Sequence, residues 1–152
     1  MPTIVKRTTL LVRDVRRSQA FYRDVLGFAT WYDDEIVVSG RGLAAGKAGD
    51  RTRLVIMRAE DPVVGMIGLL QFVADELPAP PRRDRLGIGD VVFVLSTDDV
   101  AGVHERARAF GARIYAEPHA YEVKGADGQL ARMTSLSVWD PDDYFLEINQ
   151  RH

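Results

Sequence analysis

The sequence predicts an α+β fold in which two βαβββ modules, in a pseudo-twofold arrangement, form a curved, cup-like mixed sheet. Three observations support this prediction. The order strand, helix, three strands occurs twice, a glycine ends each predicted helix (Gly27 and Gly111), and a proline-rich segment separates the copies. We expect one domain over residues 1–152, with module 1 at about 3–75, a linker at about 76–87 and module 2 at about 88–150.

Module 1 begins with residues 4–13, which are rich in β-branched and apolar types and predict a strand. Asp14 fits a helix N-cap, and an apolar stripe predicts a helix over Val15–Leu26 that Gly27 ends. Three further strands are expected near 28–38, 52–59 and 65–73.

Module 2 repeats this order after the prolines of the linker. Residues 90–97 predict a strand, and either Asp98 or Asp99 caps a helix that Gly111 ends. Strands follow near 112–122, 130–139 and 143–149. The segments Leu69–Phe72 and Phe145–Ile148 look alike, so we expect Gln71 and Glu147 to be counterparts in the repeat.

Composition excludes several function classes. A net charge of −2 gives no electrostatic basis for binding nucleic acid or an anionic membrane. The absence of cysteine excludes disulfides, thiolate zinc sites and a cysteine nucleophile. The N-terminus lacks the apolar run of a signal peptide, and no stretch reaches the roughly 20 apolar residues of a membrane span. We therefore expect a cytoplasmic protein without nucleic-acid or membrane partners.

Near the C-terminus, an Asp-Pro-Asp-Asp turn precedes a strand that carries the single carboxylate Glu147 among apolar neighbours. Glu147 shares its face of the strand with Phe145 and Asn149. A buried carboxylate is costly unless it is paired, hydrogen-bonded or bound to a metal. Glu147 is therefore the leading candidate for a functional residue.

Three segments together resemble the vicinal oxygen chelate superfamily, which includes glyoxalase I, bleomycin-resistance proteins, methylmalonyl-CoA epimerase and extradiol dioxygenases. These segments are Leu10–Phe28, the Asp99-Val and Phe110-Gly-Ala pair, and the Asp140-Pro-Asp turn before Leu146-Glu147-Ile148. The resemblance covers nearly the whole chain and implies the two-module fold. It does not fix the reaction, because one fold hosts many activities.

Family enzymes usually bind one divalent metal through side chains from the first and last strand of each module. The resemblance places these four positions on Arg7, Gln71, Val92 and Glu147. Arginine and valine cannot bind a metal, so we expect no cofactor, and Arg7 is a candidate to pair with Glu147. A two-residue shift would instead join Asp90 to Gln71 and Glu147, an oxygen set that suits Mg²⁺ or Mn²⁺.

Two functions follow from the resemblance. The first is metal-free binding of a small aromatic or apolar ligand in the cup, as in bleomycin-resistance proteins. The second is a glyoxalase-like lyase or isomerase with Glu147 as acid or base and Gln71, His119 or Tyr121 orienting the substrate. Whether the protein is an enzyme stays open, and the resemblance also implies a homodimer. The expected ligand-binding residues are Arg7, Gln71, Asp90, Val92, Trp31, Phe72, Phe93 and Met57.

Overall fold

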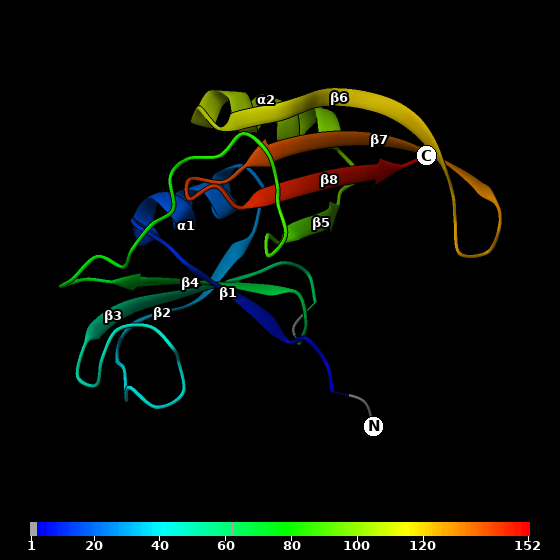
Figure 1. Ribbon diagram of the computed structural model, residues 1–152. Helices are drawn as coiled ribbons and strands as arrows, with labels where there is room; N and C mark the ends of the chain where they lie inside the picture. The colour runs from blue at the N-terminus through cyan, green and yellow to red at the C-terminus, as the bar shows by residue number, and fades with distance from the viewer. Residues whose placement is uncertain (1–2, 62) are drawn as a thin grey trace. The chain divides into compact units, whose positions relative to one another are not determined.

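The chain folds into two βαβββ units, Met1–Pro81 and Arg82–His152, in a computed structural model that describes residues 3–61 and 63–152 (Figure 1). The boundary between the units lies inside the segment predicted to be a linker. The predicted α+β class and the order of elements in both modules are confirmed. The cup that the two modules were expected to form together stays a prediction.

Module 1 is a four-stranded mixed sheet with strand order β1-β4-β3-β2. Strand β1 runs parallel to β4, and the other pairs are antiparallel. Helix α1 contacts β2, β3 and β4, so it covers one face of this sheet. The elements are β1 (Arg7–Leu11), α1 (Val15–Asp24), β2 (Ala29–Val37), β3 (Arg51–Arg58) and β4 (Met66–Phe72).

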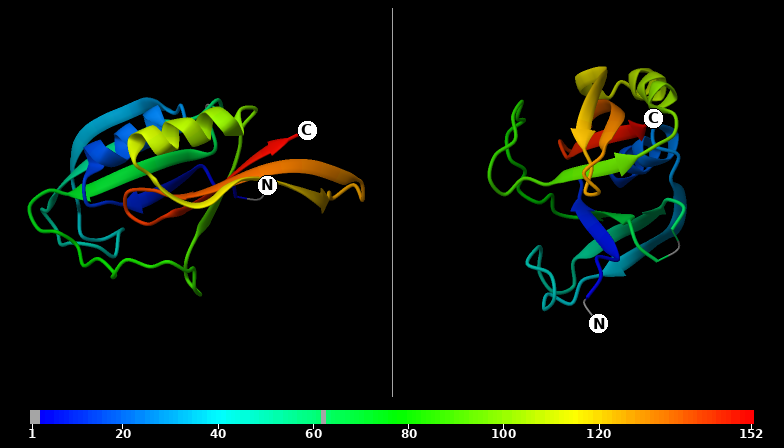
Figure 2. Two further views of the ribbon diagram at one scale, coloured as in Figure 1. Left: turned by 90° about the horizontal axis from the view of Figure 1, so that it is seen from above. Right: turned by 90° about the vertical axis from the view of Figure 1, so that its right-hand side faces the viewer.

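Module 2 repeats this topology with strand order β5-β8-β7-β6, in which β5 is parallel to β8. Helix α2 contacts β6, β7 and β8 and covers one face. The far end of the β6–β7 hairpin extends beyond the last residue of β8 (Figure 2). The elements are β5 (Val92–Ser96), α2 (Val100–Phe110), β6 (Arg113–Lys124), β7 (Leu130–Trp139) and β8 (Phe145–Arg151).

The first amide groups of helix α1 are satisfied from two directions. The carboxylate of Asp14 accepts hydrogen bonds from the N–H groups of Arg16 and Arg17, as the predicted N-cap requires. The side-chain oxygen of Gln71, on β4, accepts from the N–H of Val15 at 3.0 Å. The N-terminus of α1 is thereby attached to the central strand of its sheet.

Helix α2 begins in the same way. Of the two predicted caps, the structure uses Asp99, which accepts from the N–H of Gly102 at 2.9 Å. A Cβ at Gly102 would lie 2.0 Å from an Asp99 carboxylate oxygen, so a side chain there would displace the capping carboxylate. The side-chain oxygen of Gln150, on β8, accepts from the N–H of Val100 at 3.1 Å. Gln150 therefore repeats in module 2 the role of Gln71 in module 1.

This repeat corrects the expected pairing of Gln71 with Glu147. In module 1, Leu11 lies opposite Leu70, and in module 2 Ser96 lies opposite Asn149. Counting from these pairs makes Gln150 the counterpart of Gln71 and Gly68 the counterpart of Glu147. Aligning the similar segments Leu69–Phe72 and Phe145–Ile148 misplaces the register by three residues. The expected equivalence of Gln71 and Glu147 is therefore wrong.

The glutamine contacts also determine which side chains of β8 face the helix. Because side chains alternate along a strand, Leu146 and Ile148 share the helix side with Gln150, and they are almost fully buried. Glu147 and Asn149 point to the other side of the sheet. We call this side the helix-free face of module 2, and we use the same term for the equivalent side of module 1.

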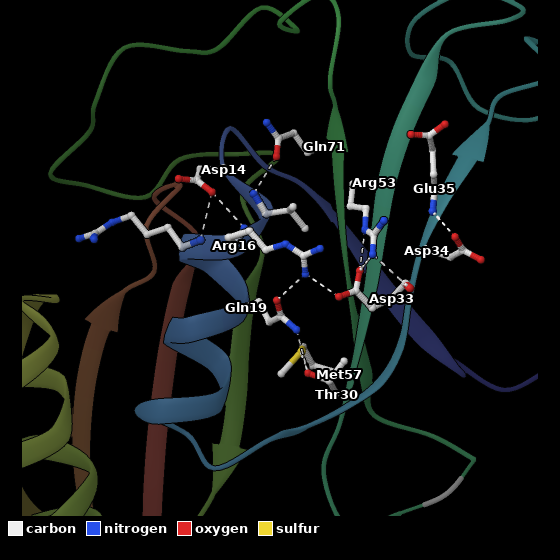
Figure 3. Close-up of polar contacts among 12 residues, drawn as sticks. Asp14, Arg16, Gln19, Thr30, Asp33, Asp34, Glu35, Arg53, Met57 and Gln71 are labelled. Carbon is white, nitrogen blue, oxygen red and sulfur yellow. Dashed lines mark hydrogen bonds and ion pairs between the residues drawn. The ribbon is translucent and has the colours of Figure 1, made fainter.

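In module 1, the carboxylate of Asp33 on β2 joins α1 to β3 (Figure 3). One oxygen accepts from Arg16 at 2.5 Å and the other from Arg53 at 2.6 Å. The hydrogen bond from Arg16, followed by the one from Arg53, lowers the pKa of Asp33. Among the residues that the structure describes, the neighbouring Asp34 accepts only from the backbone of Glu35, so it serves as a matched control.

We predict that Gln150→Met lowers the free energy of unfolding by about 1 kcal/mol, because the N–H of Val100 loses its acceptor. Gln150→Glu keeps an acceptor at the helix N-terminus and should preserve stability. Urea denaturation of the three proteins measures both effects. Equal losses for the two variants would show that the cap is not the cause.

Asp33→Asn should lower the free energy of unfolding at pH 7 by roughly 0.5–1 kcal/mol, as measured for partly exposed ion pairs. Because the folded-state pKa of Asp33 is lowered, its contribution is complete above the unfolded-state value of about 3.9 and disappears as pH falls through the lowered value. Denaturation curves across this acid range should therefore converge with the wild type. Asp34→Asn should show no such convergence, since no arginine in residues 3–61 and 63–152 pairs with Asp34.

Candidate functional site

The helix-free face of module 2 gathers polar side chains from three adjacent strands. On β8 it carries Glu147 and Asn149, which lie opposite Ser137 and Ser135 of β7. Ser135 in turn lies opposite His119 of β6. We call this group, together with Tyr121, the polar strip; its members are His119, Tyr121, Ser135, Ser137, Glu147 and Asn149.

Three members of the polar strip form a chain of hydrogen bonds. The amide nitrogen of Asn149 donates to Oε1 of Glu147 at 2.8 Å. The hydroxyl of Tyr121 donates to the amide oxygen of Asn149 at a longer 3.4 Å. Asn149 is only 7% exposed, whereas Glu147 and Tyr121 are half-buried. The carboxylate is therefore oriented by a buried amide and remains reachable from solvent.

His119 lies beside this chain on the same face. Its ring centroid is 6.1 Å from that of Tyr121, and its Nδ1 lies 3.0 Å from the carbonyl oxygen of Glu117. A carbonyl only accepts, so Nδ1 must carry the proton in this contact. In the neutral ring this leaves Nε2 as an acceptor. The three residues that the sequence suggested for chemistry, Glu147, His119 and Tyr121, thus lie on the same face. Tyr121 is linked to Glu147 through Asn149, and His119 lies beside Tyr121.

Asn149 was recognised in the sequence as a neighbour of Glu147 on its strand, but not as a site residue. Ser135 and Ser137 were also missed. The period-two alternation of β8 contained the signal for Asn149, since residues two apart share a face. No sequence signal aligned β7 with β8, because that register is set by backbone pairing.

An aromatic cluster borders the polar strip at the start of β8. Phe145 packs edge-on against Trp139 and Tyr115, with ring centroids 4.8 Å and 5.5 Å away. The guanidinium of Arg113 lies 4.4 Å from the centroid of Trp139 and is paired with Asp143. Trp139 and Phe145 are buried, whereas Tyr115 is 49% exposed, so Tyr115 is the ring of this cluster that a small organic molecule could contact.

Strand β5 provides the edge of the same face. Val92 lies opposite Phe145 and Val94 lies opposite Glu147. Both valines are substantially exposed, at 41% and 66%. An apolar strip therefore flanks the carboxylate on the side away from Ser137.

The structure places Asp90 before β5, in the loop. Its carboxylate forms a two-point ion pair with Arg83 and accepts from the N–H of Gly87. The Gly87 hydrogen bond, and then Arg83, lower the pKa of Asp90. Arg7 is paired with Met66, the first residue of β4, and Val92 is paired with Phe145, the first residue of β8. Val92, and not Asp90, is therefore the counterpart of Arg7.

In module 1, the side chain of Arg7 lies over Gly68. A Cβ added to Gly68 would meet Oγ1 of Thr9 at 2.8 Å and Cδ of Arg7 at 3.2 Å. The space that a longer side chain would need at Gly68 is therefore occupied. Gln71, which the resemblance suggested as a ligand, lies on the other face and caps α1 (Figure 3).

The residues at the equivalent positions of the two modules do not fit the metal site that the resemblance implies. The four positions, first and last strand of each module, carry Arg7, Gly68, Val92 and Glu147, and only the last offers an oxygen ligand. Within each unit, the described residues also contain no group of three or more His, Asp or Glu that could hold a metal ion.

The remaining expected ligand residues are distributed over different surfaces. Met57 is fully buried and lies opposite Ile67 on the side that α1 covers, and Phe93 lies opposite Leu146 on the α2 side. Phe72 is buried against the loop at Gly46, where a Cβ would meet its ring at 2.2 Å. Trp31 is 51% exposed at a bulge in β2.

We predict that Asn149→Asp destabilises the protein by about 1–3 kcal/mol at neutral pH, because it places a second carboxylate beside Glu147. The like charges raise the pKa of the pair in the folded state, so the loss should shrink as pH falls through that raised value. Chemical denaturation over this pH range measures the effect. Asn149→Ser removes the hydrogen bond without adding charge, so its loss should change less with pH than that of Asn149→Asp. An equal or larger pH dependence for Asn149→Ser would contradict the prediction.

Comparison with solved structures finds the same fold at low sequence identity. A glyoxalase family protein from Bacillus cereus has a TM-score of 0.78 at 14% identity, covering 97% of this chain and 93% of that one. The trypanothione-dependent glyoxalase I of Leishmania major gives 0.64 at 17%, covering 98% and 87%. A fosfomycin resistance protein from Listeria monocytogenes, complexed with Mn(II) and sulfate, gives 0.57 at 15%, covering 99% and 93%.

The search of curated proteins finds no match. A family model matches residues 4–148, which is nearly the whole chain, and the resemblance seen in the sequence is confirmed. The chain belongs to the Glyoxalase/Bleomycin resistance protein/Dioxygenase superfamily.

Proposed function

We propose that this protein binds a small organic molecule on the helix-free face of module 2, with Glu147 as the polar anchor and without a divalent metal. The observation that supports this most directly is the hydrogen-bonded chain Tyr121–Asn149–Glu147 beside the aromatic cluster of Phe145. An oriented polar group next to apolar and aromatic surface is the usual composition of a small-molecule site.

The absence of a fitting donor set supports the metal-free part of the proposal. A guanidinium at position 7 stays protonated and offers no lone pair, and Gly68 and Val92 have no donor atoms in their side chains. Glu147 uses one carboxylate oxygen to accept from Asn149. Within module 2 its second oxygen accepts no hydrogen bond, so it can contact a ligand directly.

A lyase or isomerase of the glyoxalase kind is the second candidate. It is favoured by one observation: Glu147 is a half-buried carboxylate held by a neutral amide, with an acceptor oxygen left for a substrate proton. In that case Glu147 would remove a proton next to a carbonyl, with Tyr121 or His119 orienting the substrate. Two of the relatives reported above carry glyoxalase names, which describe those proteins.

The binding proposal predicts that planar aromatic fragments shift the backbone NMR signals of β6, β7 and β8. The shifts should persist after exhaustive EDTA treatment, because no metal takes part. Glu147→Gln, which still accepts from Asn149, should weaken binding by about tenfold, as expected for loss of one charged hydrogen bond of about 1.4 kcal/mol. Binding that disappears with EDTA and returns with Mn²⁺, Ni²⁺ or Zn²⁺ would overturn the metal-free proposal.

A separate measurement tests the lyase or isomerase candidate. An enzyme that uses Glu147 as its base should exchange the C–H protons of dihydroxyacetone for deuterium in D₂O, and Glu147→Gln should abolish this exchange. Our first proposal predicts no exchange above the uncatalysed rate. Protein-dependent exchange that Glu147→Gln removes would make the lyase or isomerase the better assignment.

None of the helices in residues 3–61 and 63–152 is long and apolar enough to cross a membrane. The homodimer and the cytoplasmic location expected from the sequence stay predictions.

A further inference from the structure

We propose that the ligand of the polar strip is a hydrogen-bond donor, such as an amidine, amine, amide or phenol, and not a carboxylate or a phosphate. This inference rests on the proposed function and names the chemical class of its ligand. It follows from the direction in which each hydrogen bond of the strip points.

The carboxylate of Glu147 determines which group donates in each hydrogen bond of the chain. An ionised carboxylate only accepts, so the contact at 2.8 Å requires the NH₂ group of Asn149 to face Glu147. The amide oxygen of Asn149 must then face Tyr121, whose hydroxyl has to donate. The hydroxyl proton of Tyr121 and one N–H of Asn149 are therefore used within this chain, and the second N–H belongs to a residue that is only 7% exposed.

The hydroxyls of Ser135 and Ser137 can donate as well as accept, but both serines are buried, so what remains for a ligand is a set of acceptors. The second oxygen of Glu147 is one of them, and the lone pairs of the Tyr121 hydroxyl are another. Nε2 of neutral His119 is a third, because its Nδ1 proton is used on the carbonyl of Glu117. A ligand with two N–H or O–H groups can satisfy these acceptors, whereas an anion would place its own lone pairs against them.

The cations of this face lie at its ends. At the Trp139 end, Arg113 is paired with Asp143, and Arg85 donates to the hydroxyl of Tyr115. At the other end, Arg151 is the last residue of β8, two residues beyond Asn149, and it is exposed. The centre of the strip therefore has acceptors and one carboxylate, and the exposed ring of Tyr115 and the exposed valines of β5 suit a planar body.

Benzamidine and benzoate test the inference directly, because they share a planar ring and size but present donors and acceptors respectively. We expect benzamidine to bind at least about tenfold more tightly in NMR titrations, a difference of about 1.4 kcal/mol. Glu147→Gln should remove that preference. Glu122→Gln should retain it, since Glu122 lies opposite Arg132 on the hairpin, outside the strip.

The outcomes separate the two proposals. If benzoate binds as well as or better than benzamidine and Glu147→Gln alters its binding, the polar strip is the binding site but its ligand is not a hydrogen-bond donor. If benzoate binds preferentially and only Arg151→Gln removes it, the donor class is wrong and the site lies at the end of β8. If neither probe shifts the signals of β6–β8 at millimolar concentration, both proposals are wrong.

Discussion

Each module depends on one hydrogen bond that attaches the start of its helix to its central strand. Gln71 accepts from Val15 and Gln150 accepts from Val100, so the same contact occurs in both halves of the chain. A free N–H at a helix start that is packed against a sheet would be costly, and the glutamine removes that cost. Because strand side chains alternate, this contact also assigns every other residue of β4 and β8 to the opposite face.

That assignment gives the helix-free face of module 2 its chemistry. With Gln150 committed to the helix, Glu147 and Asn149 have to lie on the other face, where the β6–β7 hairpin adds Tyr121 and His119. Fixing the direction of one amide then fixes the direction of the rest, because a carboxylate accepts and a phenol can donate. A polar strip with outward-facing acceptors results from a contact made on the opposite side of the sheet.

Module 1 carries different residues at the equivalent positions. Where module 2 has a small apolar Val92 beside a strand that carries Glu147, module 1 has the long Arg7 beside Gly68. The missing side chain at Gly68 is what allows the stem of Arg7 to lie flat on β4. A guanidinium and a glycine offer no side-chain donor atoms for a metal, so the two modules share their topology while the side chains at these positions differ.

Short-range patterns in the sequence determined the elements of this protein. Helix caps, glycine stops and apolar periodicity depend on residues a few positions apart, so Asp14 and the order of the strands could be predicted. The same alternation placed Asn149 on the face of Glu147. Only the tertiary structure decided the register between distant strands, which makes Gly68 and not Gln71 the counterpart of Glu147. Backbone pairing over long sequence separations sets that register, and a slip of one residue reverses every side chain, which local similarity cannot detect.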